Sequence, residues 1–287
     1  MKKILRIVLV ISIVAILVLI MLGAQWCAFP GRITDSPYTD QVVTNGVQST
    51  FQQGVIYRYP DMMPMLSLSG NHYQMGLQYG VLLRPEILES LESYERILHW
   101  QAQEMGISPF LLVGILRYQA NQMAQQLPER FQEQARGISE GAGVPLHTIY
   151  SISLFYDVAS GLGCTSVLMR GPDGTIIHGR NQDTASFGGS ELGKLSIIVR
   201  YAAPGYNTVT HIDYPLYLGL DTGYNDQGIG FSEQTLHIDT PDPNGFPILL
   251  LARIALEEAS TLDEVRALFD EYSVIGAYGT VWSDRDT

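Results

Sequence analysis

The pattern of apolar residues changes at Cys164 from one typical of helices to one typical of strands, and this change limits the folds that the chain can adopt. Before Cys164, apolar residues recur at helical spacing, as at Leu83, Ile87 and Leu91. After Cys164, short β-type runs alternate with turns rich in glycine, proline and asparagine, until helical runs return from Phe246. Helices, then strands, then helices predict an α+β fold in which sheet layers are covered by helices.

Local signals place the expected elements. Helices are predicted within residues 71–98, 108–126, 128–143, 146–158, 247–260 and 261–272, and strands within 63–70, 165–169, 175–181, 194–202, 208–214, 229–238 and the first part of 277–287. Ser108 followed by Pro109 marks one helix start, and Thr261 with Glu264 forms a capping box at another.

Length and composition narrow the class of protein. The chain has 287 residues, of which 46% are hydrophobic, enough for one large domain or two small ones. We divide it into residues 1–29 (targeting segment), 30–62 (linker that becomes extended), 63–163 (helical part) and 164–287 (β-rich part of the same domain). The formal net charge of −12 excludes a strongly basic face, so no nucleic-acid partner is expected.

The first 29 residues have the pattern of a membrane or targeting segment. MKKILR is a short basic flank, and residues 7–22 are apolar except Ser12. This length suits either an uncleaved transmembrane signal anchor or a cleaved signal peptide, and both remain open. Since the basic flank stays in the cytoplasm, the predicted protein is membrane-anchored with an extracytoplasmic body, or secreted after cleavage.

The last residues, AYGTVWSDRDT, read as a strand followed by half of a turn. A strand that stops at its turn lacks the partner strand to which its backbone would bond. We therefore expect the chain to be truncated, with the natural fold continuing beyond Thr287.

The stretch GCTSVLMRGPDGTIIHGRNQD carries the candidate chemistry. Cys164 is the only cysteine after Cys27, and Arg180 and Asp183 follow it on the far side of a predicted hairpin turn. A guanidinium near a thiol favours the thiolate, whereas a carboxylate opposes it unless it holds a positive group. Such a group would be the α-amine released by cutting the Gly163–Cys164 bond, which could then serve as base for its own thiol. Taken alone, a single cysteine also fits a buried hydrophobe.

This stretch resembles the nucleophile segment of the N-terminal-nucleophile (Ntn) hydrolases. The likeness is greatest to the group that holds acyl-CoA:6-aminopenicillanate acyltransferases, choloylglycine hydrolases and acid-ceramidase-like amidases. Three further stretches resemble the acyltransferase branch, namely SGNHYQMGLQYGVLL, LPERFQEQARGISEGAGVP and GYNDQGIGFSEQTLHI. Each is moderately specific, but their shared order over about residues 63–284 makes the resemblance strong.

The resemblance implies a four-layer αββα sandwich and autocatalytic cleavage at Gly163–Cys164. It assigns Cys164 as nucleophile, Arg180 as the charge that tunes the thiol and contacts substrate, and Asp183 as the residue that orients the α-amine. Relatives commonly carry an oxyanion-hole asparagine where this chain has Ser-Glu-Gln, so Gln234 or backbone N–H groups are expected to serve instead. Asn225 fits either a turn residue or an active-site residue.

The sequence therefore predicts a hydrolase that cleaves a linear N-acyl amide through a thioester at Cys164. Two alternatives stay open: an acyltransferase that uses the same thioester, and a catalytically inactive binding or scaffold protein. The expected partners are a small N-acyl amide substrate and the membrane. No cofactor and no metal site are expected, because no histidine or cysteine pattern has metal-ligand spacing. Substrate identity and oligomeric state stay open, and His178 is interpreted as a structural strand residue.

Overall fold

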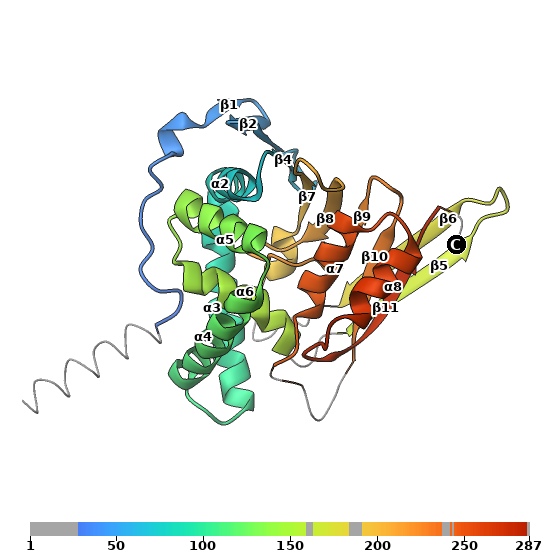
Figure 1. The fold of residues 1–287 in the computed structure, drawn as a ribbon. Helices are drawn as coiled ribbons and strands as arrows, with labels where there is room; N and C mark the ends of the chain where they lie inside the picture. Colours follow the sequence, from blue (N-terminus) through green and yellow to red (C-terminus); the bar gives the residue numbers. More distant parts are fainter. Residues whose placement is uncertain (1–27, 159–162, 184–190, 237–241, 243, 286–287) are drawn as a thin grey trace, which may run out of the picture.

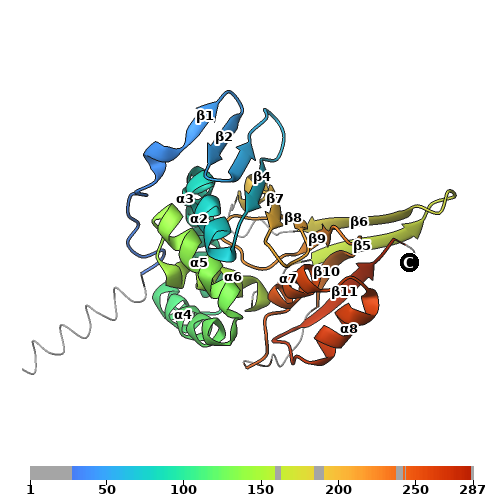
Figure 2. The ribbon, with the colours of Figure 1, turned by 45° about the horizontal axis from the view of Figure 1, so that its top comes forward.

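The computed structural model describes residues 28–285 except 159–162, 184–190, 237–241 and 243, and its centre is a nine-stranded sheet (Figures 1 and 2). Its strands are β1 (Val43–Asn45), β2 (Gln48–Phe51), β3 (Gly54–Tyr57), β4 (Met65–Ser69), β7 (Ile197–Ala202), β8 (Val209–Asp213), β9 (Thr222–Asn225), β10 (Gly230–Leu236) and β11 (Ala277–Ser283). They lie side by side in this order. Only β4 and β7 pair in parallel, and every other neighbouring pair is antiparallel.

Helices cover this sheet in two groups. They are α2 (His72–Leu82), α3 (Arg84–Glu104), α4 (Pro109–Gln126), α5 (Glu129–Ala142), α6 (Leu146–Val158), α7 (Ile248–Glu258) and α8 (Leu262–Asp270), with short 3₁₀ turns at Thr39–Gln41 and Leu192–Leu195. In Figure 1, α2 to α6 gather beside the first strands, while α7 and α8 lie across β8 to β11. Under α7 and α8, Phe231 of β10 packs on Trp282 of β11 at 4.5 Å between ring centroids.

A separate hairpin forms the second β layer. Strands β5 (Gly163–Arg170) and β6 (Ile176–Asp183) pair only with each other and pack on β10 and β11. Figure 2 shows the hairpin on one side of the large sheet and α7 and α8 on the other. On its outer face Val167 and Ile177 are 45% and 48% exposed, so no helix among the described residues covers it. The observed fold is thus a mixed α+β fold with α, β and β layers at this end.

Glycines set the distance between α2 and α5. A Cβ atom on Gly76 would lie 2.1 Å from the carbonyl oxygen of Gln134, and one on Gly137 would lie 2.3 Å from that of Tyr73. Gly80 and Gly141 meet the opposite backbone in the same way, at 2.5 and 2.6 Å. The two helices therefore touch backbone to backbone, which only glycine permits. The helical motifs that support the family resemblance are thereby explained by packing.

Several local predictions are confirmed. The hydroxyl of Ser108 accepts a hydrogen bond from the backbone N–H of Leu111 at the start of α4. Thr261 and Glu264 form the predicted capping box of α8. Helix α5 ends at Gly143, which adopts the left-handed backbone conformation at φ 70°. In each case a side chain or a glycine satisfies the unpaired backbone groups of a helix end.

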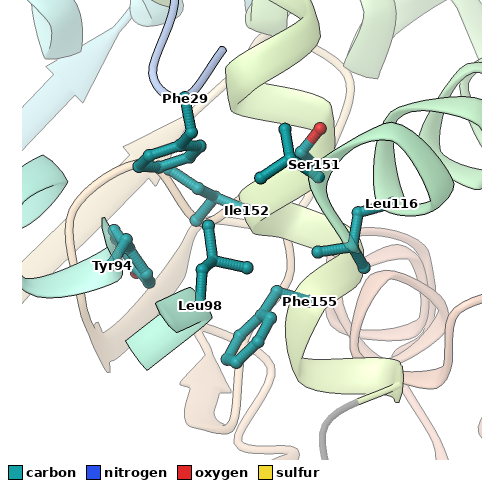
Figure 3. Close-up of a pocket in the computed structure, with 8 residues that line it drawn as sticks. Phe29, Tyr94, Leu98, Leu116, Ser151, Ile152 and Phe155 are labelled. Atoms are coloured by element: carbon teal, nitrogen blue, oxygen red, sulfur yellow. The ribbon is translucent and has the colours of Figure 1, made fainter. Parts of the chain in front are cut away.

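The first described residues run along the helices as a strap, defined here as residues 28–34. Phe29 lines an apolar pocket between α3, α4 and α6, together with Leu98, Leu116 and Phe155 (Figure 3). Buried Arg117 of α4 donates to the carbonyl oxygen of Ala28 at 2.6 Å. The strap is thus held by one aromatic anchor and by hydrogen bonds to the helices.

The structure differs from the prediction over residues 30–62. The segment interpreted as a linker contains β1, β2 and β3, which form an antiparallel meander at the edge of the large sheet. Buried Phe51 and Ile56 hold this meander against the core. Alternation of buried and half-buried residues marks β2 and β3, but the runs are short enough to be hidden among the turn formers.

The predicted localisation needs correction. No helix among the described residues is long and apolar enough to cross a membrane. The longest, α3, has 21 residues, but it carries charged side chains such as Glu89, Glu92 and Arg96, which are costly in a bilayer. The predicted segment 1–29 falls, up to residue 27, outside the described residues. The prediction of a membrane-anchored or secreted protein is therefore withdrawn.

The contact between α2 and α5 yields a stability prediction. Gly137→Ala should lower the free energy of unfolding by about 3 kcal/mol, because the new methyl group must force two helix backbones apart. Gly193→Ala is the matched control, since a Cβ atom there meets no atom of the described residues within 4 Å, and it should change stability by less than about 0.5 kcal/mol. Urea unfolding of both variants measures the difference. Equal midpoints would contradict a backbone contact that depends on glycine.

Candidate active site

The hairpin brings Cys164 and Arg180 together. Cys164 is the second residue of β5 and pairs across the hairpin with Gln182, while Arg180 pairs with Ser166. Because side chains of paired residues share a face, Cys164 and Arg180 point to the same side of the hairpin. Arg180 Nη2 donates to the sulfur of Cys164 at 3.0 Å, and the thiol is partly buried. The predicted contact between guanidinium and thiol is present.

A carboxylate from the large sheet completes this contact. Arg180 Nη2 also donates to Oε1 of Glu233 on β10 at 2.9 Å, and both side chains are only 4% exposed. The same Glu233 oxygen lies 3.9 Å from the sulfur of Cys164, within reach of its thiol proton. Arg180 therefore joins the hairpin to the large sheet at the position of the thiol.

A second carboxylate lies close to these groups. Asp221, just before β9, is 2% exposed, and its Oδ2 accepts from Nε2 of Gln182 at 2.6 Å. Its other oxygen, Oδ1, is buried and has no hydrogen-bond partner among the described residues. The same holds for Nε and Nη1 of Arg180. The site thus has two buried donor atoms on Arg180 and one buried acceptor atom on Asp221 that no described residue bonds.

Burial and neighbouring charges both shift the pKa values of the ionisable groups in the site. Burial raises the pKa of the Cys164 thiol, Arg180 lowers it, and Glu233 and Asp221 raise it further. The pKa of Arg180 is raised: burial opposes its charge, but Asp221 and Glu233 outweigh that effect. Burial also raises the pKa of Asp221, against the opposing effect of Arg180. The thiol is accordingly protonated near neutral pH and needs a base to become a nucleophile.

A chain of hydroxyl groups and one imidazole holds the hairpin on the sheet. His178 Nε2 lies 2.7 Å from the hydroxyl of Ser232, and His178 Nδ1 lies 2.9 Å from that of Ser283. Ser232 in turn donates to Ser166 at 2.7 Å. Burial lowers the pKa of His178, which favours the neutral ring. These contacts fit the interpretation of His178 as a structural strand residue, two positions from Arg180 along β6.

The remaining predicted residues lie apart from the thiol. Asp183 pairs with Gly163, but its side chain is exposed on the other face of the hairpin, where it accepts from Asn181 at 2.7 Å. Asn225 is buried and bonds the carbonyl oxygens of Leu256 and Ala259 at 3.0 and 2.8 Å. Its side-chain oxygen accepts from two backbone N–H groups in its own turn. These contacts fit the turn interpretation of Asn225.

Gln234, the other predicted oxyanion residue, lies on β10 opposite Gly279. Its side chain is half-buried, and its Oε1 lies near the backbone of Gly279. Gln234 is thus one residue beyond Glu233, which contacts Arg180. Within the described part of the chain, no group of three or more histidine, cysteine or acidic residues could hold a metal ion.

Sequence reasoning missed Glu233 and Asp221. Each carries an ionisable group into a stretch of buried residues: Glu233 follows buried Phe231 and Ser232, and Asp221 follows buried Leu220. An acidic residue within a run of residues expected to be buried could have indicated a site, because charged residues are rarely buried without a partner. The sequence does not reveal that both partners lie on the hairpin.

Comparison with known proteins gives a consistent family relation. Residues 169–284 match the family described as acyl-coenzyme A:6-aminopenicillanic acid acyl-transferase. A Caenorhabditis elegans N-acylethanolamine-hydrolyzing acid amidase is 33% identical over 112 residues, which cover 36% of this chain and 31% of the relative. Mouse acid ceramidase is 29% identical over 113 residues, covering 36% of this chain and 28% of the relative.

The matches are partial. The chain spans less than a third of the length of these two curated relatives. A solved structure of a Caenorhabditis elegans N-acylethanolamine-hydrolyzing acid amidase ortholog aligns with a TM-score of 0.35 and 20% identity, covering 42% of this chain and 55% of the other. The activity of a whole relative therefore does not transfer directly to this chain.

The site predicts opposite effects of its two charges on the thiol. Glu233→Gln should lower the pKa of Cys164, because it removes a negative charge that stabilises the protonated thiol; Arg180→Met should raise it. We expect shifts of about one pH unit in each direction. The rate of alkylation at the Cys164 peptide, followed by mass spectrometry against pH, measures both. Glu191→Gln, at an exposed ion pair, is the control, and shifts of the same sign in both variants would contradict the geometry.

Proposed function

The chain is related to the N-terminal-nucleophile hydrolase superfamily, and on that premise we propose that it is an amidohydrolase with Cys164 as its nucleophile. Its reaction is the cleavage of a linear N-acyl amide through a thioester. The observation that carries the proposal is the contact of the Cys164 thiol with buried Arg180, beside Glu233 and directly after Gly163. This arrangement supports a thiol whose ionisation is governed by fixed charges.

The first step of the proposal is self-cleavage of the chain. The Cys164 sulfur attacks the carbonyl carbon of Gly163, so that a C–S bond forms, the Gly163–Cys164 C–N bond breaks, and the thiol proton passes to the leaving nitrogen. Water then hydrolyses this ester, which frees the Gly163 carboxylate and restores the thiol. Glu233, 3.9 Å from the sulfur, is the group that could accept the thiol proton while no α-amine exists.

The second step is substrate hydrolysis. The α-amine of Cys164 takes the thiol proton, the sulfur attacks the acyl carbonyl, and the proton passes on to the leaving amine. Water then cleaves the thioester and releases a carboxylic acid. A base is needed because burial keeps the thiol pKa high. The unused Nε and Nη1 of Arg180 are donors suited to the substrate carbonyl oxygen.

An acyltransferase is the second candidate. The observation that favours it is the match of residues 169–284 to an acyl-transferase family. Both reactions pass through the same thioester, and they differ only in whether water or an amine accepts the acyl group. The proposal also includes the four-layer αββα sandwich, in which the nine-stranded sheet and the hairpin would be the two inner layers.

Self-cleavage gives the sharpest prediction. Purified wild-type protein should consist of two fragments, one of which begins CTSVLM, whereas Cys164→Ala should remain one chain because it has no nucleophile. Intact mass and N-terminal sequencing measure this. Cys27→Ala is the matched control and should be cut like the wild type. An uncut wild-type chain would exclude the proposed maturation and favour a binding protein on this fold.

Hydrolysis and transfer are separated by a partition experiment. We expect N-acyl aminomethylcoumarins of varied acyl length to release coumarin and free acid, and Arg180→Met to lower kcat/KM by about 100-fold or more. Adding a primary amine as acceptor should leave the acid as main product. An amide product that replaces the acid as acceptor concentration rises would support the acyltransferase instead. No release from any probe by a correctly cut chain would argue against both.

A further inference from the structure

Two buried acidic side chains and one buried guanidinium surround the thiol. Arg180 contributes one positive charge, and Glu233 and Asp221 contribute two carboxylates, all with little exposure. Buried charges are stable only when they are paired and hydrogen-bonded. One oxygen of Asp221, Oδ1, has no hydrogen-bond partner in the described chain. Oδ1 of Asp221 is therefore suited to accept from one additional hydrogen-bond donor, and a positively charged donor would offset the cost of burying the carboxylate.

The position of Asp221 indicates which group that is. Its Oδ2 is held by Gln182, which lies directly across the hairpin from Cys164. Asp221 is also close enough for its charge to act on the thiol. The proposed cut would turn the backbone nitrogen of Cys164 into an α-ammonium group on the Cα atom that bears this thiol. The cut would thus add a second cation, besides Arg180, near the carboxyl group of Asp221, whose Oδ1 has no hydrogen-bond partner among the described residues.

We propose that Asp221 is a positioning residue that holds the α-ammonium group of Cys164 through its free Oδ1 once the chain has been cut. The assignment rests on the proposed function and adds a residue to it. The resemblance assigns this task to Asp183, whose carboxylate lies exposed on the opposite face of the hairpin. Asp221 and Glu233 are both buried on the face of the thiol, but Glu233 is paired with Arg180, whereas Oδ1 of Asp221 has no hydrogen-bond partner among the described residues. Burial strengthens the attraction of such a carboxylate for a cation.

The carboxyl group of Asp221 should affect the pKa of the Cys164 α-amine. A neighbouring carboxylate stabilises the ammonium form and raises the pKa of the α-amine, whereas burial and the guanidinium of Arg180 lower it, so the test is the change in this pKa when the carboxylate is removed. Asp221→Asn should lower that pKa by about one unit, since the stabilising charge is lost. Asp221→Glu keeps the charge and should restore most of the wild-type value. Asp183→Asn should shift it less than Asp221→Asn does.

The test is a pH titration of full-length protein labelled with nitrogen-15 cysteine, in which the α-nitrogen of a free N-terminal cysteine is distinct from amide nitrogens. Asp226→Asn, a carboxyl group in the exposed turn after β9, is the matched control and should leave the titration unchanged. An unchanged pKa in Asp221→Asn, or a larger shift in Asp183→Asn, would overturn the assignment.

The experiment separates this inference from the proposed function. If the wild-type chain shows no free α-amine, the chain is not cut, and both ideas fail together. If the amine is present and Asp221→Asn does not shift it, only the role of Asp221 fails. Should Asp221→Asn not fold or not be cut, Asp221→Ser takes its place, because it also removes the carboxylate, and an unchanged amine pKa in that variant overturns the assignment in the same way.

Discussion

The buried contact between Arg180 and Glu233 is the interaction on which the site depends. It joins a two-stranded hairpin to a nine-stranded sheet, and it fixes the guanidinium against the thiol of Cys164. A two-stranded hairpin has little stability alone, so its position must come from such contacts with the larger sheet. A buried ion pair adds little net stability but is strict in geometry, because either charge left alone would be costly. The contact therefore defines position more than it stabilises the fold.

The packing of the helices rests on another strict constraint, the backbone contact of α2 and α5. Motifs that looked like family signatures in the sequence have a direct physical cause, because Gly76 and Gly137 lie where a methyl group would collide with a carbonyl oxygen. These helices cover the first strands of the sheet, and the strap with Phe29 closes the pocket between α3, α4 and α6. The helices are held together by close backbone contact and by apolar side chains packed between them. The hairpin β5–β6, in contrast, is held on the large sheet by polar contacts.

The sequence predicted what depends on neighbours along the chain. The hairpin turn and the spacing of Cys164 and Arg180 sufficed to place guanidinium and thiol together, because register in a hairpin is local. The same local view failed for Glu233 and Asp221, which reach the thiol only because the hairpin packs on β10. It also could not tell which face Asp183 takes, since one residue along a strand reverses the direction of a side chain. Strands β1 to β3 were missed because their runs are short and lie among turn formers.

The parallel pairing of β4 with β7 has a consequence for a chain that is cut before Cys164. Met65 to Ser69 would then belong to one fragment and Ile198 to Ala202 to the other, yet they form adjacent strands of one sheet. The two pieces would share a continuous hydrogen-bonded surface and a common core, and so would stay together as a heterodimer without any covalent link. Unfolding would become a dissociation, and the midpoint of thermal denaturation would rise with protein concentration. After the cut, the protein could refold only by association of the two fragments and no longer as a single chain.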